Sequence, residues 1–488
     1  MKKVLTTIVL MLSVIATSCI DDLNVIQTST INSEGMWKSE SDLKAAMYGS
    51  YYRFRNAYRI NISYWGDYRA GTIGPGMGSF SGNELVSNTL TSAEGKGTNW
   101  SGLYTTINQC NQILKYVDQV DYNNDNIRLE IKANAYFMRA YCYFTIGRVW
   151  GDAPLMLTGI ESTEEDIFPE RIDESKIFEQ VEFDLKEALA IMPESVKSRT
   201  TASLGAVNML RTDYFLWKYR RRNGSSDDLA EAKTACLAVL QNSNYKLLDS
   251  YANVFDIKNK RNDEIIFCIP FEKTTEEMTN YMDDYLIPLS KMTDNESYAR
   301  NEDIKVGSQD QWCSFSTPFQ KLLYSDPADT RTQTNFMSFT VPETNNTYSW
   351  INKFPGEWSD NTRYFVSDIP LYRYSEAILF MAEILNEEND PSNAIEYLNI
   401  VTKRAYQIEN YYPLTLDPDQ VAEVILKERL KEFAAENKSW WDYIRMGFAF
   451  TKIPSLQGRQ NETNILLWPI SSASFEENPN IRQTVGYN

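Results

Sequence analysis

Aromatic side chains in two stretches without helical periodicity are the residues of this sequence best suited to binding chemistry. Trp65, Tyr68 and Phe80 lie in the glycine-rich stretch 61–99, and Tyr285, Trp312 and Trp358 lie in the polar, turn-rich stretch 245–368. Aromatic faces pack against the C–H side of sugar rings, while amide, hydroxyl and carboxylate groups hydrogen-bond the sugar hydroxyls. These six residues are therefore our candidate ligand-binding residues, and they favour an oligosaccharide as the ligand.

Catalytic chemistry finds little support in the same sequence. It contains no histidine, which excludes Ser-His-Asp and Cys-His nucleophiles and His-ligated zinc. No Walker loop is present, and the glycines between Gly71 and Gly82 match no dinucleotide fingerprint. A glycoside hydrolase needs only two carboxylates, and 66 acidic residues always allow a pair, but no pair stands out. We therefore expect a binding protein without catalytic residues.

We also expect no cofactor, no metal and no nucleic-acid partner. Asp121, Asn123 and Asp125 imitate the start of a calcium loop, but its sixth position is Asn126 instead of Gly and its twelfth is Lys132 instead of Glu. The formal net charge of −18 argues against non-specific binding to nucleic acid.

The first residues form the clearest local signal. Lys2 and Lys3 precede an apolar run over 4–16 that is too short to span a bilayer, as in a secretory signal peptide. The run ends in Ala16-Thr17-Ser18-Cys19, which resembles a bacterial lipobox, although an ordinary signal peptide remains an alternative. We expect a signal peptide over 1–18, lipidation with palmitate at Cys19 and a tether over 19–35. Acidic residues directly after Cys19, Asp21 and Asp22, resemble the tract that directs Bacteroidetes lipoproteins to the cell surface.

The elements that position the candidate residues are helices, and the stretch 133–155 is central among them. Ala133, Tyr136, Phe137, Ala140 and Phe144 follow the spacing of one helical face, and the other side is almost as apolar. Such a helix is buried among other helices. Arg139 and Arg148 interrupt it, and we expect both to form internal ion pairs.

Further helices are expected along the rest of the chain, at 43–54, 100–117, 127–150, 177–191, 203–220, 228–240, 370–386, 391–405, 418–435 and 440–445. Helix pairs joined by short turns are typical of a helical solenoid. The stretch 264–270 is expected to be extended. Arg429 lies in an apolar stripe flanked by Glu428 and Glu432, which indicates an internal ion pair. The fold class is thus mostly α, with large irregular insertions at about 61–99 and 245–368 in a single domain over 36–488.

Five cysteines follow Cys19, at positions 110, 142, 236, 268 and 313. They are odd in number and widely spaced, and at least Cys110, Cys142 and Cys236 lie in apolar helical patterns. We interpret them as small buried hydrophobic residues, not as a disulfide framework or a metal cluster.

Several separated motifs together resemble one family, the SusD/RagB nutrient-uptake lipoproteins of Bacteroidetes. They are Arg139-Ala140-Tyr141-Cys142-Tyr143-Phe144 with Gly151-Asp152-Ala153-Pro154-Leu155; Pro370-Leu371-Tyr372-Arg373-Tyr374-Ser375-Glu376 with Met381-Ala382-Glu383; Glu428-Arg429 with Trp440-Trp441-Asp442 and Arg445; and Asn478-Pro479-Asn480. One departure is Asn437, where relatives often have glycine; asparagine tolerates the left-handed backbone that glycine adopts.

The resemblance implies a scaffold of four tetratricopeptide-like helix pairs carrying the irregular segments. It also implies an outer-membrane lipoprotein that covers a SusC-like TonB-dependent transporter and binds oligosaccharides without cleaving them. The motifs lie on the scaffold, so they identify the fold better than the ligand. A peptide-capturing relative and a scaffold that binds only protein remain alternatives, and the aromatic residues of the irregular segments favour sugar.

Overall fold

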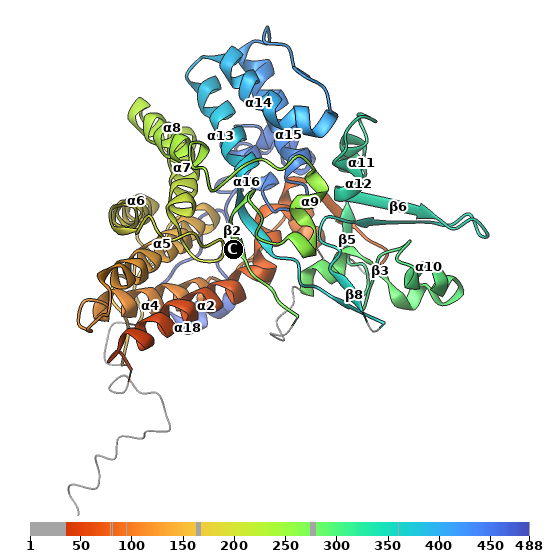
Figure 1. Ribbon diagram of the computed structural model, residues 1–488. Helices are drawn as coiled ribbons and strands as arrows, with labels where there is room; N and C mark the ends of the chain where they lie inside the picture. The colour runs from red at the N-terminus through yellow and green to blue at the C-terminus, as the bar shows by residue number, and fades with distance from the viewer. Residues whose placement is uncertain are drawn as a thin grey trace, which may run out of the picture.

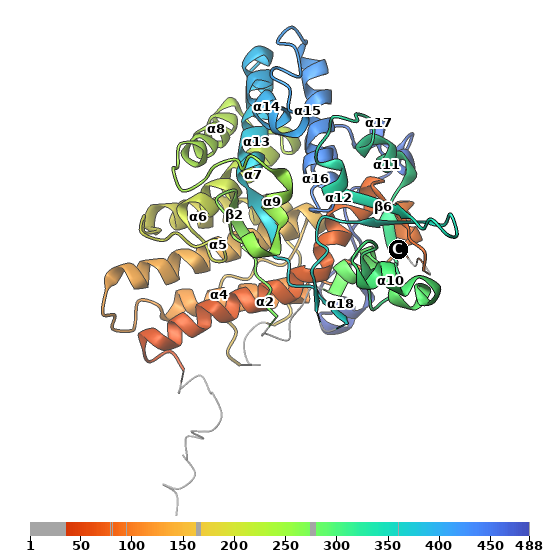
Figure 2. The ribbon, with the colours of Figure 1, turned by 45° about the vertical axis from the view of Figure 1, so that its right-hand side comes forward.

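The computed structural model describes residues 36–487 except 79, 81, 94, 163–166, 274–279 and 360. Long helices occupy one side and the top of the molecule in Figure 1, and most of the short strands lie on the other side, while β2 (Ile265–Ile269) lies near the centre. The long helices are α2 (Glu40–Gly66), α4 (Ser101–Tyr116), α5 (Asp125–Trp150), α6 (Glu174–Ile191), α7 (Leu204–Arg221), α8 (Ser226–Leu240), α13 (Tyr374–Glu387), α14 (Pro391–Tyr406) and α15 (Pro418–Glu432). Consecutive helices pack in pairs, α5 with α6, α7 with α8 and α13 with α14, and Figure 2 shows the pairs stacked on one another.

Shorter helices connect and cover this scaffold. They are α3 (Asn83–Val86), α9 (Tyr251–Phe255), α10 (Glu296–Arg300), α11 (Thr317–Leu323), α12 (Thr332–Asn335), α16 (Ser439–Arg445), α17 (Ala449–Lys452) and α18 (Ser472–Glu477). No helix among the described residues is long and apolar enough to cross a membrane.

Helix α5 confirms the central place expected for it. The Asn124 side chain accepts a hydrogen bond from the Asn126 N–H at its start, and Gly151 ends it with a φ of 72°. From Ala133 onward nearly all of its residues are buried, because α4 and α6 cover it. Asp125, one of the residues that imitate a calcium loop, pairs instead with Arg128 at 2.7 Å in the first turn of α5.

The strands form two-stranded pairs in the described part of the chain. They are antiparallel β1 (Ile73–Pro75) with β5 (Cys313–Phe315), β2 (Ile265–Ile269) with β10 (Ile369–Arg373), β6 (Phe336–Thr340) with β7 (Thr347–Ile351) and β8 (Glu357–Ser359) with β9 (Thr362–Tyr364), and parallel β3 (Ile287–Pro288) with β4 (Val306–Gly307). Ile73 lies opposite Phe315, and Ile369 lies opposite Ile269.

Two expected boundaries are wrong. Residues 370–373 belong to β10 and not to a helix, because they pair with β2, a partner about a hundred residues earlier in the chain. Helix α2 continues through Gly66, whereas the segment from residue 61 was expected to be irregular. The spacing of Phe54, Tyr58 and Ile62 shows why: the apolar face of the helix extends into that segment, and all three side chains are buried.

The predicted internal arginine pairs are confirmed. Arg139 donates two hydrogen bonds to Asp184, at 2.8 and 2.7 Å, and Arg148 pairs with Asp213 at 3.3 Å. Arg429 is also buried, but its carboxylate partners are Glu376 at 3.1 Å and Asp442 at 2.9 Å, not the adjacent glutamates of its own helix.

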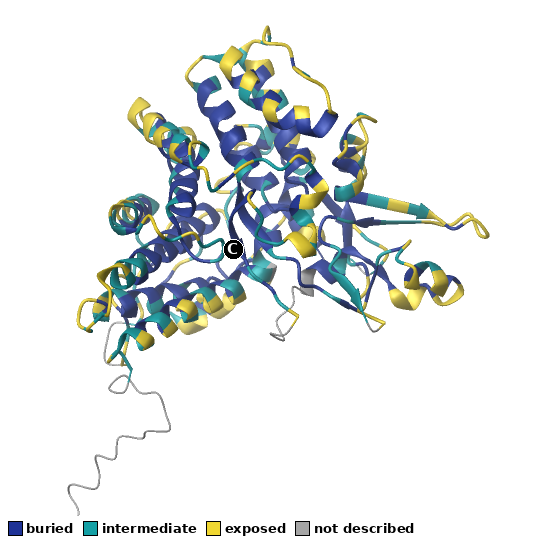
Figure 3. Cartoon of the chain, viewed as in Figure 1, coloured by how far each residue is buried: buried dark blue, intermediate teal, exposed yellow. Residues whose placement is uncertain are grey.

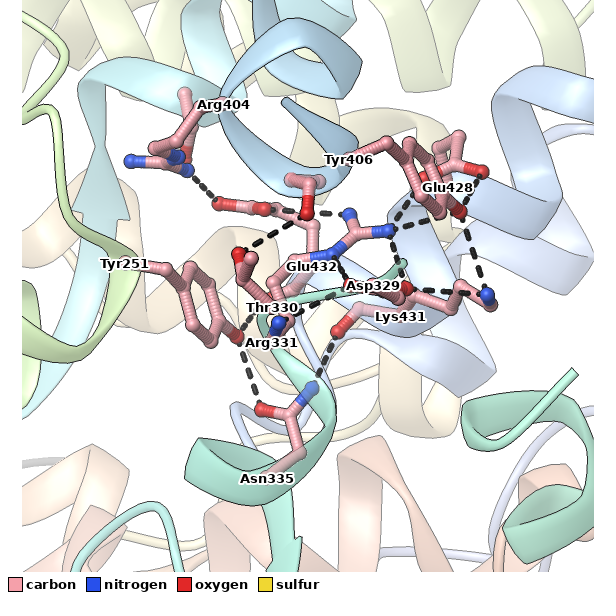
Figure 4. A network of polar contacts seen from close by, with 12 residues as sticks. Tyr251, Asp329, Thr330, Arg331, Asn335, Arg404, Tyr406, Glu428, Lys431 and Glu432 are labelled. Atoms are coloured by element: carbon pink, nitrogen blue, oxygen red, sulfur yellow. Dashed lines mark hydrogen bonds and ion pairs between the residues drawn. The ribbon is translucent and has the colours of Figure 1, made fainter. Parts of the chain in front are cut away.

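The adjacent glutamates of α15 belong to a second buried network. Glu428 and Glu432 accept hydrogen bonds from Arg331, whose guanidinium also contacts Asp329 (Figure 4). Arg373 and Arg404 also reach Glu432. Most of the buried hydrophobic residues form one cluster that extends from the helical scaffold into the irregular segments, and Figure 3 shows buried residues in both parts.

All five cysteines after Cys19 are buried and free of disulfides, as expected. Cys19 itself, the signal peptide and the tether lie outside the described residues.

Candidate functional site

The two irregular segments meet at the pair formed by β1 and β5. Beyond this pair the Gly76 N–H donates to the Trp312 carbonyl at 3.3 Å, and the Gly78 N–H donates to the Gln311 carbonyl at 2.8 Å. A side chain at Gly76 would place its Cβ 2.3 Å from the Gln311 carbonyl oxygen, so this contact requires glycine. Predicted aromatic residues from both segments, Tyr68, Phe80 and Trp312, are thereby brought together.

Three of the six candidate rings form a group at this contact. The centroid of the Trp312 ring lies 5.6 Å from that of Tyr68 and 5.1 Å from that of Phe80, with interplanar angles of 35° and 45°. Trp312 and Phe80 are half-buried, so each keeps part of its surface in solvent. The Lys96 ammonium lies 5.9 Å from the Trp312 ring centroid. We call Tyr68, Phe80 and Trp312 the aromatic group.

The inner side of the aromatic group is fixed by buried residues. The Tyr68 hydroxyl donates to Cys313 Sγ at 3.2 Å, and burial holds the pKa of Tyr68 well above its usual value. Tyr285 is only 2% exposed, and its carbonyl accepts a hydrogen bond of 3.2 Å from the Gln311 side chain. Tyr68 and Tyr285 therefore support the exposed rings instead of offering a face of their own.

A pair of carboxyl groups lies beside this support. Asp283 accepts a 2.8 Å hydrogen bond from the Ser308 N–H. Burial, and to a smaller extent the charge of Asp283, raise the pKa of the neighbouring Asp284 to about 7. Asp284 is close enough to raise the pKa of Cys313, next to Trp312. A half-buried carboxyl of this kind can both donate and accept hydrogen bonds near neutral pH.

Trp65 lies elsewhere, in the core of the scaffold. Its ring is 2% exposed, its Nε1–H donates to the Gly97 carbonyl at 2.8 Å, and its centroid lies 5.7 Å from that of Trp150. A ring with no accessible face cannot stack on a sugar, so the structure gives no support to this candidate. It faces inward because α2 extends to Gly66 and places it on the buried face.

Trp358 is half-buried on β8, where the Arg363 guanidinium lies 5.5 Å from its ring centroid. Within the described part of the chain, no ring contact joins it to the aromatic group. Trp358 therefore remains a candidate on its own.

Sequence reasoning missed Tyr64, Lys96 and Asp284. Tyr64 lies 5.3 Å from Tyr68 between ring centroids. Its position four residues before Tyr68 was a usable signal. Nothing local in the sequence distinguishes Lys96 or Asp284, because their places depend on the pairing of distant segments.

Two hollows of the surface lie away from the aromatic group. One of about 560 Å³ is lined by residues that include Asp152, Arg171 and Gln483, and a more apolar one of about 390 Å³ by residues that include Trp100, Tyr104 and Ile481. Among the described residues, no group of three or more Cys, Asp or Glu could hold a metal ion.

Comparison with known proteins places the chain in a family. The model of the SusD family matches residues 281–487, and a model described as "Starch-binding associating with outer membrane" matches residues 75–208. SusD-like protein P25 of Formosa agariphila is 26% identical over 519 residues, which cover 95% of this chain and 94% of the relative. SusD-like protein P38 of the same organism is 22% identical over 100% of this chain and 99% of its own length.

Solved structures agree over almost the whole chain. NanU of B. fragilis superposes with a TM-score of 0.83 at 25% identity, covering 95% of this chain and 99% of that protein. A SusD-superfamily protein from Bacteroides vulgatus gives a TM-score of 0.80 at 26% identity, covering 93% and 100%. The predicted helical-repeat fold with irregular insertions is confirmed, and the chain belongs to the SusD/RagB family.

Proposed function

We propose that this protein captures oligosaccharides at the cell surface and delivers them to a partner TonB-dependent transporter of the SusC type, without cleaving them. The observation that carries the proposal is the aromatic group, which joins two segments more than two hundred residues apart and leaves Phe80 and Trp312 partly exposed. Proteins of this family bind glycans at the cell surface and associate with the outer membrane, which supports the same conclusion.

In this proposal the six candidates have different roles. Phe80 and Trp312 contact the sugar rings. Tyr68 and Tyr285 hold these two side chains in place. Asp284 and Lys96, which lie beside the aromatic group, form hydrogen bonds with the sugar hydroxyls. Trp358 extends the surface, and Trp65 acts only through the core.

The anchor belongs to the proposal as well. Signal peptide removal leaves Cys19 as the first residue, and its acyl chains hold the protein at the outer membrane. Burial of each CH₂ group contributes about 0.8 kcal/mol, so several chains give stable attachment. Replacing Cys19 by Ser is expected to release the protein from the membrane fraction.

Calorimetric titration of the chain from Ile20 onward, against a panel of oligosaccharides and peptides, tests the proposal. We expect one glycan class to bind and to remain uncleaved when the mixture is analysed. Trp312→Ala and Phe80→Ala should each weaken binding about tenfold or more, because each removes apolar surface that the ligand covers.

Phe183→Ala is the matched control, because Phe183 on α6 is an equally aromatic side chain that is 50% exposed on the scaffold. Binding of peptides but not glycans would favour the peptide-capturing alternative. Cleavage of the glycan would contradict the non-catalytic proposal. Unchanged glycan affinity in both Trp312→Ala and Phe80→Ala would show that the aromatic group is not the binding site.

A further inference from the structure

A small cavity lies where the end of α2, helices α5 and α7 and the segment 436–445 meet. Its volume is about 40 Å³. Three basic side chains, among them Arg148, and four acidic side chains, among them Asp442, line it. The cavity shares no residue with the aromatic group, and of the six candidate ligand-binding residues it is lined by Trp65 alone.

Asn437 lines this cavity and has a side-chain amide that is unpartnered among the described residues. The residue is 2% exposed, and neither its Oδ1 nor its Nδ2 has a hydrogen-bond partner in the described part of the chain. Its backbone is fixed, because the Asn437 N–H donates to Asp67 Oδ2 at 3.1 Å and its φ of 63° is left-handed. Burying both ends of an amide without hydrogen bonds is strongly unfavourable, because neither group recovers the hydrogen bond that it made with water.

Asp442 and Arg148 also line the cavity, and each has one buried side-chain atom without a hydrogen-bond partner in the described part of the chain. Arg429 and Arg445 both contact Oδ1 of Asp442, at 2.9 and 2.8 Å, while Oδ2 is buried with no partner among the described residues. Burial raises the pKa of Asp442, but the charges of Arg429 and Arg445 outweigh burial and hold the pKa below its usual range. Its free oxygen therefore carries negative charge.

Arg148 contacts Asp213 through Nη1 only, at 3.3 Å. Its Nε–H has no acceptor in the part of the chain that the structure describes. Residues that line the cavity thus leave two buried donors, Arg148 Nε and Asn437 Nδ2, and two buried acceptors, Asn437 Oδ1 and Asp442 Oδ2, without partners among the described residues.

This mixture of groups decides which ligand fits. A cation would satisfy only the two acceptors, and an anion only the two donors, whereas water donates and accepts. Three basic and four acidic side chains in the lining nearly balance, so the cavity offers no strong field for an ion of either sign. One water needs about 10–15 Å³ of such space, so the volume admits about three.

We propose that this cavity is a binding site for a cluster of about three ordered water molecules that bridge Asn437, Asp442 and Arg148. The cluster links the segment before α16 to α5. It supplies hydrogen-bond partners for Asp442 Oδ2 and Arg148 Nε. Asn437 is the specific element, because a glycine at the same left-handed position would lack both amide groups.

A crystal structure of the chain from Ile20 onward at high resolution is the first test. We expect water density within hydrogen-bonding distance of Asn437 Oδ1 and Nδ2 and of Asp442 Oδ2. Crystals soaked in bromide or rubidium should show no anomalous peak in the cavity. A dry cavity, an ion peak or an Asn437 amide bonded only to protein would overturn the proposal.

A matched pair of variants tests the site in solution. Asn437→Gly and Asn389→Gly both replace an asparagine at a φ near 62°, but Asn389 is exposed. We expect the melting temperature to fall by several degrees for Asn437→Gly and to change little for Asn389→Gly. The crystal structure of Asn437→Gly should contain further water where the amide was. Equal melting temperatures of the two variants would show that the Asn437 amide makes no stabilising hydrogen bonds in the cavity, which would contradict the proposal.

Discussion

At the scale of single residues, the Glu432 carboxylate is contacted by three buried arginines. Arg373 Nη1 lies 3.0 Å from it. Arg331 Nη1 lies 3.4 Å from it, and Arg404 also donates to it (Figure 4). Burial alone would raise the pKa of Glu432, but the charges of Arg404, Arg373 and Arg331 outweigh it and hold the pKa far below its usual value. The carboxylate is therefore the common counterion of three buried guanidinium groups.

Replacing Glu432 by Gln keeps the shape of the side chain and removes its charge. We expect the free energy of unfolding to fall by about 3–5 kcal/mol, because buried guanidinium charge loses its partner. Urea denaturation measures the loss. The control is Glu423→Gln on the same helix, whose carboxylate is 59% exposed and pairs with Lys452, and this change should cost less than about 1 kcal/mol. Similar losses in both variants would contradict the assigned role of Glu432.

Asp67 gives a residue-scale prediction about pH. Burial raises its pKa from 3.8 to about 6, although it accepts hydrogen bonds from the Asn437 and Ser439 N–H groups. Because the folded state binds this proton more tightly than the unfolded state, the stabilisation is complete below pH 4 and is lost as the pH rises through 6. The loss amounts to about 2–3 kcal/mol.

The comparison of wild type with Asp67→Asn isolates this effect, since other titrating groups cancel in the difference. Urea denaturation of both proteins should show the wild type losing about 2–3 kcal/mol relative to the variant between pH 4 and pH 7. A difference that stays constant with pH would mean that Asp67 has an ordinary pKa in the folded protein.

At the scale of elements, the pairing of β1 with β5 is what brings the candidate site together. Gly76 follows β1 directly, and a Cβ there would lie 2.9 Å from the carbonyl carbon of Gln311 as well as against its oxygen. Gly76→Ala should therefore push residues 311 and 312 away and lower the free energy of unfolding by about 1–3 kcal/mol. Glycan affinity should fall with it, because Trp312 moves relative to Phe80.

Gly95→Ala is the control for this prediction, because nothing lies within 4 Å of a Cβ at Gly95. Thermal denaturation and calorimetric titration of both variants make the comparison. Unchanged glycan affinity in Gly76→Ala would separate the strand pairing from the binding site.

The helices were the most predictable elements, and α5 shows why. Its apolar residues form a continuous pattern, and only burial among other helices explains it. The strand β10 was not predictable in the same way, because its partner β2 lies about a hundred residues away and leaves no mark on the local pattern. The end of α2 was predictable but missed: Phe54, Tyr58, Ile62 and Trp65 continue one helical face.

The candidate site was likewise predictable only in part. Composition alone selected the two irregular segments, and their contact brings Tyr68, Phe80 and Trp312 together. Which rings keep an exposed face depends on tertiary packing, which composition does not contain. Trp65 is a tryptophan like Trp312, and Tyr285 is likewise aromatic, but both lie in the core.

At the scale of the whole molecule, buried charges tie the irregular segment to the helical scaffold. Glu264, directly before β2, contacts Arg373 and Arg404 at 2.6 Å each, and Arg331 contacts Glu428 of α15 at 2.6 Å. Opening either part alone would expose one side of these pairs and leave the other buried without its counterion. We therefore expect the described fold to unfold as a single unit.

The five buried cysteines report on this cooperativity. Cys110 and Cys142 lie on α4 and α5, Cys236 lies on α8, and Cys268 and Cys313 lie on β2 and β5. Burial raises the pKa of each thiol, to about 12 for Cys110, so the native protein holds almost no thiolate at pH 8. A thiol reagent therefore reacts only with molecules that open.

In moderate urea, the chain from Ile20 onward should be labelled at all five positions in one kinetic phase, with a rate that follows global unfolding. The same reagent in concentrated guanidinium chloride gives the reference rate for exposed thiols. Mass spectrometry of peptides after brief labelling identifies which positions have reacted. Early labelling of Cys268 and Cys313 would show that the irregular segment opens before the scaffold, and that the buried charges do not couple the two.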